Sequence, residues 1–284
     1  MSIAVVFALG AMLAGSLSDF TYKGVAARGI RASTFLFYQT CTFFAVLAVI
    51  ALPTGQFSKF STPALIYGPV LGAVNYFGIL LFIMSLKQGK ATVHAPIFRL
   101  SFVLTSVLAV VVLNESVTLP KVAGVLLAAT GIVSLADVGG LRQGFSERRR
   151  SLAYLLGATL IFGVTGAMTK EAFNQGASPA PLLLVQSASF TVVAFVRVLL
   201  AGELRPSGAI LRLAPLVAML QLAWAMLLFL ALEKADASVA YPIVQLSFVV
   251  TAVLAVVFYR EALSKRLVIG LAAAVLAVVA LALA

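Results

Sequence analysis

The sequence predicts an all-α integral membrane protein with ten transmembrane helices, arranged as two inverted five-helix repeats. Hydrophobic residues make up 62% of the chain, and only 10% of the residues are charged, against about 25% in an ordinary soluble domain. The apolar residues form runs of about 20, which is long enough to cross a bilayer. The two halves of the chain also resemble each other. An outer-membrane barrel is excluded because its segments of about 10 residues alternate in polarity, and these runs do not.

The hydrophobic runs divide the chain into ten predicted spans. They are 3–22, 33–52, 64–86, 92–113, 119–137, 152–170, 180–200, 211–232, 238–258 and 266–284. The first span lacks a basic start and a clear cleavage site, so we interpret it as a retained helix and not as a signal peptide. The longest connection contains three consecutive arginines. We therefore expect a first repeat at 1–137, a basic connecting loop at 138–151 and a second repeat at 152–284.

The basic residues are distributed unequally between the two sides of this topology. Of the 20 Lys and Arg residues, 15 lie in loops that follow odd-numbered spans, 4 lie on the side of the two termini, and Arg99 lies within a span. Cytoplasmic loops carry an excess of Lys and Arg. We therefore expect a multi-pass protein of a bacterial-type inner (cytoplasmic) membrane with both termini on the non-cytoplasmic side. The net charge of +11 then reflects topology, and we expect no nucleic-acid partner.

An internal repeat relates the two halves. Residues 86–115 align with 232–261 at a constant offset of 146, with identical residues at 16 of 30 positions. The matches include Pro96 with Pro242 and Glu115 with Glu261, which apolar composition alone does not produce. Because five is an odd number, the second repeat enters the membrane from the opposite side. Inverted repeats of this kind are typical of secondary transporters, and a duplicated bundle without a transport role is the alternative.

The end of each repeat has a recognisable pattern. A Glu closes the fourth span and a Gly-x-x-x-Ala motif follows in the fifth, as Glu115 with Gly124 and Ala128, and as Glu261 with Gly270 and Ala274. With the proline in each fourth span, this resembles the drug/metabolite transporter superfamily, and within it the EamA-like branch that includes the YddG-type amino acid exporters. The resemblance covers essentially the whole chain. It implies that the fifth and tenth spans pack together at the pseudo-twofold axis, and it implies cytoplasmic termini, opposite to the charge count that we follow here.

Three pairs of polar residues inside the spans occupy matching positions in the two repeats. They are Gln39 with Gln186, Asn75 with Gln221, and Arg99 with Gln245. Polar side chains within a bilayer are costly, so they often mark a substrate pathway. We expect the three pairs to line one central substrate-binding cavity. Simple hydrogen bonding between helices, worth about 0.6 kcal/mol on average, is the alternative.

Two kinds of charged or titratable residue are singled out in the spans. We expect Arg99 to bind the anionic group of a substrate, because its planar fork of donors suits a carboxylate or a phosphate. Structural pairing with helix carbonyls or with Asp19 is the alternative. Asp19 and His94 both titrate and are the candidates for proton coupling. The alternative for them is an interfacial histidine and a helix-end carboxylate.

Prolines, aromatic residues and glutamates complete the set of candidates. Pro96 and Pro242 are predicted to kink their helices and act as hinges, and Pro69 and Pro215 to bend theirs. Aromatic residues close to the polar pairs are candidates for lining the cavity, Tyr76 and Trp224 first among them. The others are Tyr38, Phe98, Tyr241 and Phe248. Glu115 and Glu261 are expected to cap helix ends.

Together these features favour a secondary transporter that exports small metabolites by alternating access, with aromatic or other bulky amino acids as the first substrate class. The alternatives are export of drugs, sugars or organic phosphates, and, in a different class, a channel-like facilitator. The sequence has no phosphate-binding loop and no hydrolase or protease motif, so we expect neither a primary pump nor an enzyme. With one cysteine, Cys41, and one histidine, we expect no metal site and no cofactor. Two fused repeats predict a functional monomer.

Overall fold

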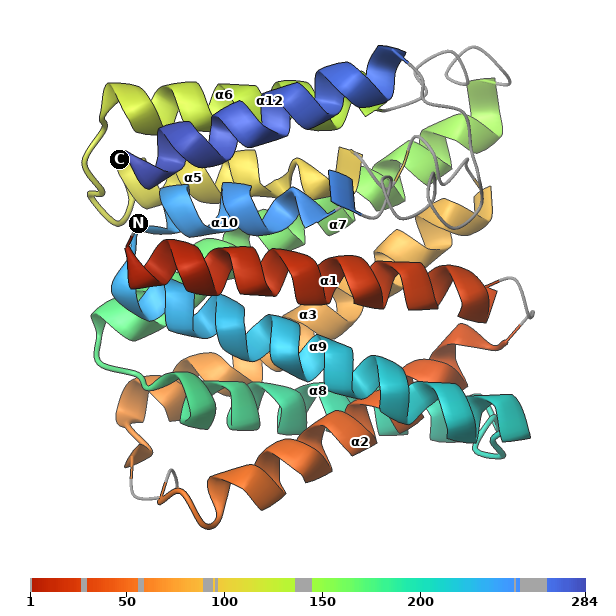
Figure 1. Cartoon of the computed structure of the whole chain (residues 1–284). Helices are drawn as coiled ribbons and strands as arrows, with labels where there is room; N and C mark the ends of the chain where they lie inside the picture. Colours follow the sequence, from red (N-terminus) through yellow and green to blue (C-terminus); the bar gives the residue numbers. More distant parts are fainter. Residues whose placement is uncertain are drawn as a thin grey trace.

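The computed structural model describes residues 2–26, 30–55, 59–88, 94, 97–135, 145–247, 249–250 and 265–284. Within this part of the chain the protein is all-helical, with ten helices and no strand (Figure 1). The helices are α1 (Ile3–Ala26), α2 (Ala32–Ala51), α3 (Thr62–Gln88), α5 (Ser101–Val111), α6 (Leu119–Leu135), α7 (Phe145–Asn174), α8 (Pro179–Leu200), α9 (Gly208–Lys234), α10 (Ala237–Gln245) and α12 (Lys265–Ala282). The predicted fold class is confirmed.

The surface of the bundle is apolar in the way a bilayer requires. Five helices are long and apolar enough to span a membrane, namely α2, α3, α7, α8 and α9. Large apolar side chains point outward from them and from the shorter helices, as with Ile66 (60% exposed), Leu156 (62%) and Leu276 (56%). Soluble proteins seldom expose contiguous apolar patches of this kind. The chain is a multi-pass membrane protein whose outer surface faces lipid.

The two repeats pack around a pseudo-twofold axis. The repeat offset pairs α1 with α7, α2 with α8, α3 with α9, α5 with α10, and α6 with α12. The helix contacts obey this pairing, because α1 packs on α9 as α7 packs on α3, and α2, α5 and α6 each contact their own partner in the other repeat. Both termini lie at the same end of the bundle (Figure 1), as expected for an even number of membrane crossings.

Small residues allow α6 and α12 to approach closely. A Cβ atom added at Gly131 would lie 3.3 Å from the carbonyl oxygen of Gly270 and 3.6 Å from the Cβ of Ala273. Ala128 is fully buried, and Ala274 is 7% exposed. Such small-residue faces are typical of helix pairs in membranes. The expectation that the fifth and tenth spans pack together is confirmed.

Two glycines end their helices in the left-handed region. Gly176, after α7, has a φ of +93°, and Gly202, after α8, has a φ of +65°. The next residues complete the turns, because the N–H of Ala177 donates to the carbonyl of Ala172 at 2.9 Å and the N–H of Glu203 donates to that of Val198 at 3.0 Å. These are Schellman caps, for which glycine is favoured. The turn at Gly202 brings the chain back beside the start of α2.

The structure differs from the predicted spans at three places. The spans 92–113 and 238–258 were expected as continuous helices, but each is interrupted by a turn, at Leu100 and at Leu246. The amide of each turn residue bonds three residues back, Leu100 to Ile97 at 3.0 Å and Leu246 to Ile243 at 3.1 Å, which tightens the helix locally. The second break comes one turn after Pro242 and not at the proline. The third difference is that α7 begins at Phe145, within the expected connecting loop.

Candidate functional site

The polar centre of the protein is formed by Arg99, Asp19 and Gln245. Nη1 of Arg99 donates to Oε1 of Gln245 at 2.9 Å, and Nη2 forms an ion pair with Oδ2 of Asp19. The Arg99 side chain is 17% exposed and the Asp19 side chain 29%. Since a charge within a membrane helix is costly unless it is paired, this geometry satisfies Arg99 while joining α1, the residues just before α5, and α10.

The chain positions these groups through the interrupted fourth and ninth spans. Arg99 and Gln245 are each the residue immediately before the turn, at Leu100 and Leu246 respectively. A tight turn frees helix backbone from the regular pattern and changes the direction in which the preceding side chain points. The same interruption in both repeats therefore presents Arg99 and Gln245 to each other across the axis.

The second repeat has no counterpart of Asp19. At the repeat offset of the first helices, Asp19 corresponds to Gly166, and Tyr241 occupies the space there. A Cβ added at Gly166 would lie 3.2 Å from Cζ of Tyr241, whose hydroxyl donates to the carbonyl of Gly166 at 3.4 Å. The polar centre is thus asymmetric, with one cation and one carboxylate on the side of the first repeat.

Helix α1 adds further hydroxyl groups next to Asp19. Nε2 of Gln221, on α9, donates to Oγ of Ser18 at 2.8 Å. Oγ of Ser16 donates to the carbonyl of Ser247 at 2.8 Å. Both serines are fully buried. Gln221 therefore contacts the same helix as Asp19, as its predicted place near the centre requires, while Ser16 and Ser18 were not predicted.

Trp224 packs against α1 one turn from Asp19. A Cβ added at Gly15 would lie 2.9 Å from Cδ1 of Trp224 and 3.5 Å from the Cβ of Ser247. In the other half the ring belongs to α7 and the glycine to α3. Phe162 of α7 packs on Gly78 of α3, with 2.7 Å between Cε2 and the added Cβ. Each large ring thus requires a glycine on the facing helix.

An aromatic cluster lies beside Arg99. Phe98, the preceding residue, stacks on Phe82 of α3 with ring centroids 4.2 Å apart, and meets Phe162 edge-on at 5.0 Å. The cluster thus ties the residue before Arg99 to α3 and α7. Phe98 was predicted to line the site, whereas Phe82 and Phe162 were not.

Asn75 and Gln186, from the two remaining pairs, form no hydrogen bond to this centre within the described residues. Oδ1 of Asn75 and Oε1 of Gln186 are buried and have no hydrogen-bond partner in the described part of the chain. Gln39 is 8% exposed on α2. Tyr76 is 3% exposed and faces Phe190 of α8, 5.4 Å between ring centroids. Tyr76 thus faces α8, and the expectation that the three pairs line one cavity stays a prediction.

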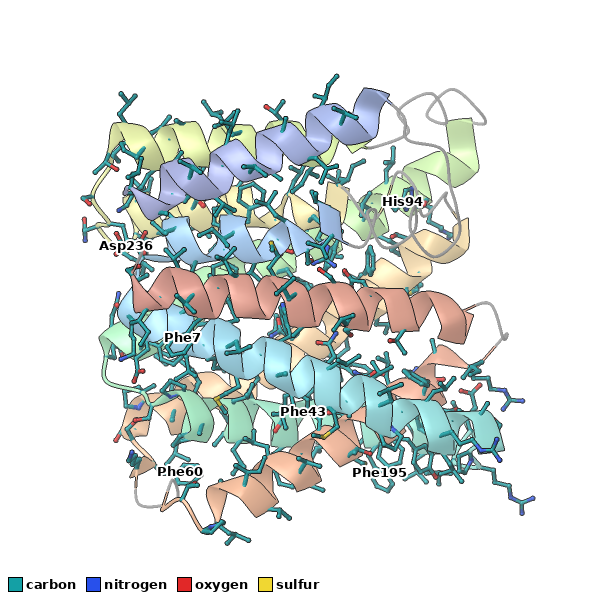
Figure 2. The ribbon with its side chains drawn as sticks, viewed as in Figure 1. Phe7, Phe43, Phe60, His94, Phe195 and Asp236 are labelled. Carbon is teal, nitrogen blue, oxygen red and sulfur yellow. The ribbon has the colours of Figure 1, made fainter. Side chains whose placement is uncertain are left out.

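The remaining candidate residues lie elsewhere in the bundle or outside the described residues. His94 is 5% exposed and lies toward the opposite end of the bundle from Asp236 (Figure 2). No hydrogen bond or ion pair within the described residues joins His94 to Asp19. Tyr38 donates its hydroxyl to the carbonyl of Leu204 at 2.8 Å, outside the centre. Pro69 and Pro215 lie inside helices that continue through them. Pro96, Phe248 and Glu261 lie outside the described residues.

A second polar cluster joins the repeats at the end where the termini lie. Glu115 accepts hydrogen bonds from the N–H groups of Ala237 at 2.6 Å and Ser238 at 3.1 Å, so it caps α10 as expected. Lys121 forms an ion pair with Asp236, which Figure 2 labels at this end. Lys170 donates to the carbonyls of Leu232 and Ala235, both at 2.8 Å. The sequence signals for this cluster were a Glu before a helix start and a Lys repeated at the offset of 147.

The polar centre presents hydrogen-bond donors to an anion. No group of three or more His, Cys, Asp or Glu residues that would hold a metal ion occurs in the part of the chain that the structure describes. Arg99 already holds one carboxylate, that of Asp19, through a guanidinium that suits such a group. A ligand carboxylate would meet the same donors.

Comparison with known proteins assigns the family. The profile of the EamA-like transporter family matches the chain twice, at residues 2–136 and 149–283. A solved structure described only as "Crystal structure of protein" is 18% identical, covers 99% of this chain and 96% of its own, and superposes with a TM-score of 0.76. This similarity concerns the fold alone. No match was found among curated proteins. The two family matches cover nearly the whole chain, which belongs to the EamA-like transporter family.

Proposed function

We propose that this protein is a secondary transporter that exports small metabolites, and amino acids first among them, by alternating access. The observation that carries the proposal is the contact between Arg99 and Gln245. These two residues occupy equivalent positions in the repeats and meet across the axis. A substrate bound at the axis is equally accessible from either side of the membrane. Transporters built from inverted repeats bind their substrates at such a repeat interface.

A carboxylate is the anionic group that the centre favours. Arg99 pairs with the carboxylate of Asp19, and the amide of Gln245 shares the guanidinium. A substrate carboxylate that displaced Asp19 would accept from Nη2 of Arg99, and from Nη1 as well if it also displaced Gln245. Asp19 would then be free to face the substrate's ammonium group. The ring of Trp224, which packs on α1 one turn from Asp19, suits an apolar side chain. These features support a zwitterion with a bulky side chain as the substrate.

Exchange of partners at Arg99 also suggests how transport is coupled to protons. The carboxylate of Asp19 cannot pair with the substrate's ammonium group and hold a proton at the same time, so the two compete for it. Substrate binding in one state and proton binding in the other would then alternate. Asp19 has this role in the proposal because it touches Arg99. His94, the other titratable candidate, shares no contact with it in the described residues.

The test is flux in proteoliposomes. The purified protein is reconstituted and tested with labelled aromatic and branched amino acids, with a sugar and an organic phosphate as comparisons. Saturable counterflow of an amino acid supports the proposal, since a channel gives no counterflow. Counterflow of the organic phosphate alone would mean that the anionic group of the substrate is a phosphate and not a carboxylate. Linear flux without saturation would replace the transporter with a channel-like facilitator.

The orientation in the membrane is part of the proposal. The end rich in Lys and Arg, which includes Arg31, Arg197 and Arg205, is assigned to the cytoplasm on the positive-inside rule, and the termini to the other side. Cys41 is replaced by Ser, and a single cysteine is introduced at Ser207 or at Ser116, near opposite ends of the bundle. Labelling of intact cells by an impermeant maleimide at Ser116 only supports this orientation, and labelling at Ser207 only reverses it.

A further inference from the structure

A cavity separate from the polar centre lies between α2, α3 and α8. Its volume is about 160 Å³, and Arg31, Ser33, Tyr76, Arg197 and Glu203 form its polar wall. The remaining wall is apolar and comes from Leu36 on α2 and from a face of α3 that includes Leu80 and Met84. None of the residues of the Arg99 centre lines it. We call it the α2–α3–α8 cavity.

The charges around this cavity leave a positive excess. Arg31 and Arg197 are both exposed, and within the described residues neither forms an ion pair with a carboxylate. Glu203 is directed to the hydroxyl of Ser33, which donates to Oε2. Two cations against one anion leave the lining with a net charge of +1, and the start of α2 adds its partial positive charge. The cavity therefore attracts an anion.

Tyr76 adds a hydrogen-bond donor to the same cavity. The residue as a whole is only 3% exposed, it lines the cavity, and no described residue forms a hydrogen bond with its hydroxyl. The hydroxyl is therefore available to donate to a ligand oxygen in the cavity. Two guanidinium groups and one phenol hydroxyl are a donor set suited to a phosphate.

The surroundings identify where such a phosphate is attached. The cavity is smaller than the roughly 300–1,000 Å³ of pockets that enclose a whole drug-sized ligand, so it admits a headgroup and not a large solute. Around Arg197, α8 exposes Phe195 (42%) and Leu199 (52%); Figure 2 labels Phe195 on this part of the helix. Both residues lie two positions from Arg197 along α8. Basic pockets between membrane helices at the Lys/Arg-rich side are typical sites for anionic lipids.

The repeat provides an internal comparison. At the offset of 147, Arg31 corresponds to Ser178 and Arg197 corresponds to Ile50, while Tyr76 corresponds to Leu222 at the offset of 146. The three equivalent positions thus carry no arginine and no tyrosine, although α9 contacts α2 as α3 contacts α8. This kind of helix contact therefore forms in the other half without them.

We propose that the α2–α3–α8 cavity binds the phosphate group of an anionic phospholipid, with the acyl chains along the exposed face of α8. Arg31 and Arg197 contact the phosphate oxygens, and Tyr76 donates a hydrogen bond to one of them. The proposal is independent of the transported substrate.

The experiment measures lipid binding by the full chain purified in detergent. Phosphatidylglycerol and phosphatidylcholine of equal chain length are titrated, with inorganic phosphate as the soluble comparison, and binding is followed by native mass spectrometry. The variants are R31Q/R197Q and Tyr76→Phe. R205Q/R212Q is the matched control, because it removes two exposed arginines from the same end of the bundle outside the cavity.

We expect phosphatidylglycerol to bind about tenfold more tightly than phosphatidylcholine, and R31Q/R197Q to remove this preference. Tyr76→Phe should weaken phosphatidylglycerol about threefold, and R205Q/R212Q should leave it unchanged. Equal loss in the control, or equal affinity for both lipids, overturns the proposal. Arginine-dependent binding of inorganic phosphate without a lipid preference overturns the lipid assignment. If R31Q/R197Q does not elute as a monodisperse protein, Tyr76→Phe alone tests the proposed site. An unchanged lipid preference in Tyr76→Phe would then count against the site.

Discussion

Arg99 and Gln245 lie 146 residues apart, occupy equivalent positions in the two repeats, and contact each other through a hydrogen bond of 2.9 Å. Equivalent residues of two symmetric halves can touch only where they reach the symmetry axis. Two arginines at this place would repel each other, and two glutamines would carry no charge. The actual pair places a single cation on the axis, and Asp19 neutralises it.

Replacing Arg99 tests its proposed role in substrate binding. Arg99→Gln should lower the apparent affinity of counterflow for the amino acid by at least about tenfold, since a hydrogen bond to a charged group contributes about 1.5–3 kcal/mol. Arg99→Lys should restore only part of it, because an ammonium lacks the bidentate fork. The measurement is the concentration dependence of counterflow, with Arg205→Gln as an exposed control. Wild-type affinity in Arg99→Gln would remove the proposal.

The single tryptophan reports occupancy of the centre. Trp224 packs on Gly15, one turn from Asp19, and no other tryptophan occurs in the sequence. Adding the transported amino acid should therefore change the intrinsic fluorescence in a saturable way, and Arg99→Gln should shift the midpoint to higher concentration. Trp224→Phe gives the background signal. A change that is equally large in Arg99→Gln would mean that the ligand binds elsewhere.

Proton coupling is predicted to depend on Asp19. Asp19→Asn retains the shape of the side chain but cannot lose or gain a proton, so a pH gradient should no longer drive accumulation. Counterflow at equal pH should persist, because the competing carboxylate has been removed from Arg99. His94→Gln serves as the comparison and should leave the gradient response unchanged. The reverse outcome, with the response lost only in His94→Gln, would assign coupling to the histidine.

The crossing of α3 and α8 depends on Gly72. A Cβ at this position would overlap the carbonyl oxygen of Gln186 and lie 2.9 Å from the backbone nitrogen of Phe190. Backbone atoms cannot rotate away, so Gly72→Ala should destabilise the protein by about 1–3 kcal/mol, as overpacking does. Thermal unfolding in detergent measures the effect. Gly208→Ala is the control, because its added Cβ meets no atom within 4 Å; equal stability of the two variants would contradict this packing.

Glu115 is predicted to hold the start of α10. It accepts hydrogen bonds from the amides of Ala237 and Ser238, and loss of such a cap costs about 0.5–2 kcal/mol. In Glu115→Gln, amide hydrogen exchange in the peptide that covers these residues should accelerate about three- to thirtyfold. Glu233→Gln, an exposed glutamate nearby, should leave exchange at its wild-type rate. No acceleration in Glu115→Gln would show that the cap does not stabilise α10.

Much of the architecture follows from sequence patterns. The apolar runs predicted the positions of the helices, and the family resemblance implied the α6–α12 contact. The turns at Leu100 and Leu246 were not predicted, because the kinks were expected at Pro96 and Pro242, four residues earlier, and no residue type marks a local change of hydrogen-bond pattern. The capping role of Glu115 was predicted, but its target, the amide of Ala237, lies in the other repeat.

The sequence by itself determined the family, the inverted repeat and the equivalence of Arg99 with Gln245, because duplication preserves residue order and hydropathy records the membrane. The tertiary structure alone decided which equivalent residues meet. Successive residues of a helix point about 100° apart, so Asn75 and Tyr76, neighbours in the chain, present different faces. Tyr76 lines the α2–α3–α8 cavity with Arg31 and Arg197. The packing of neighbouring helices, which no single-helix pattern encodes, sends Arg99 to the axis and Tyr76 away from it.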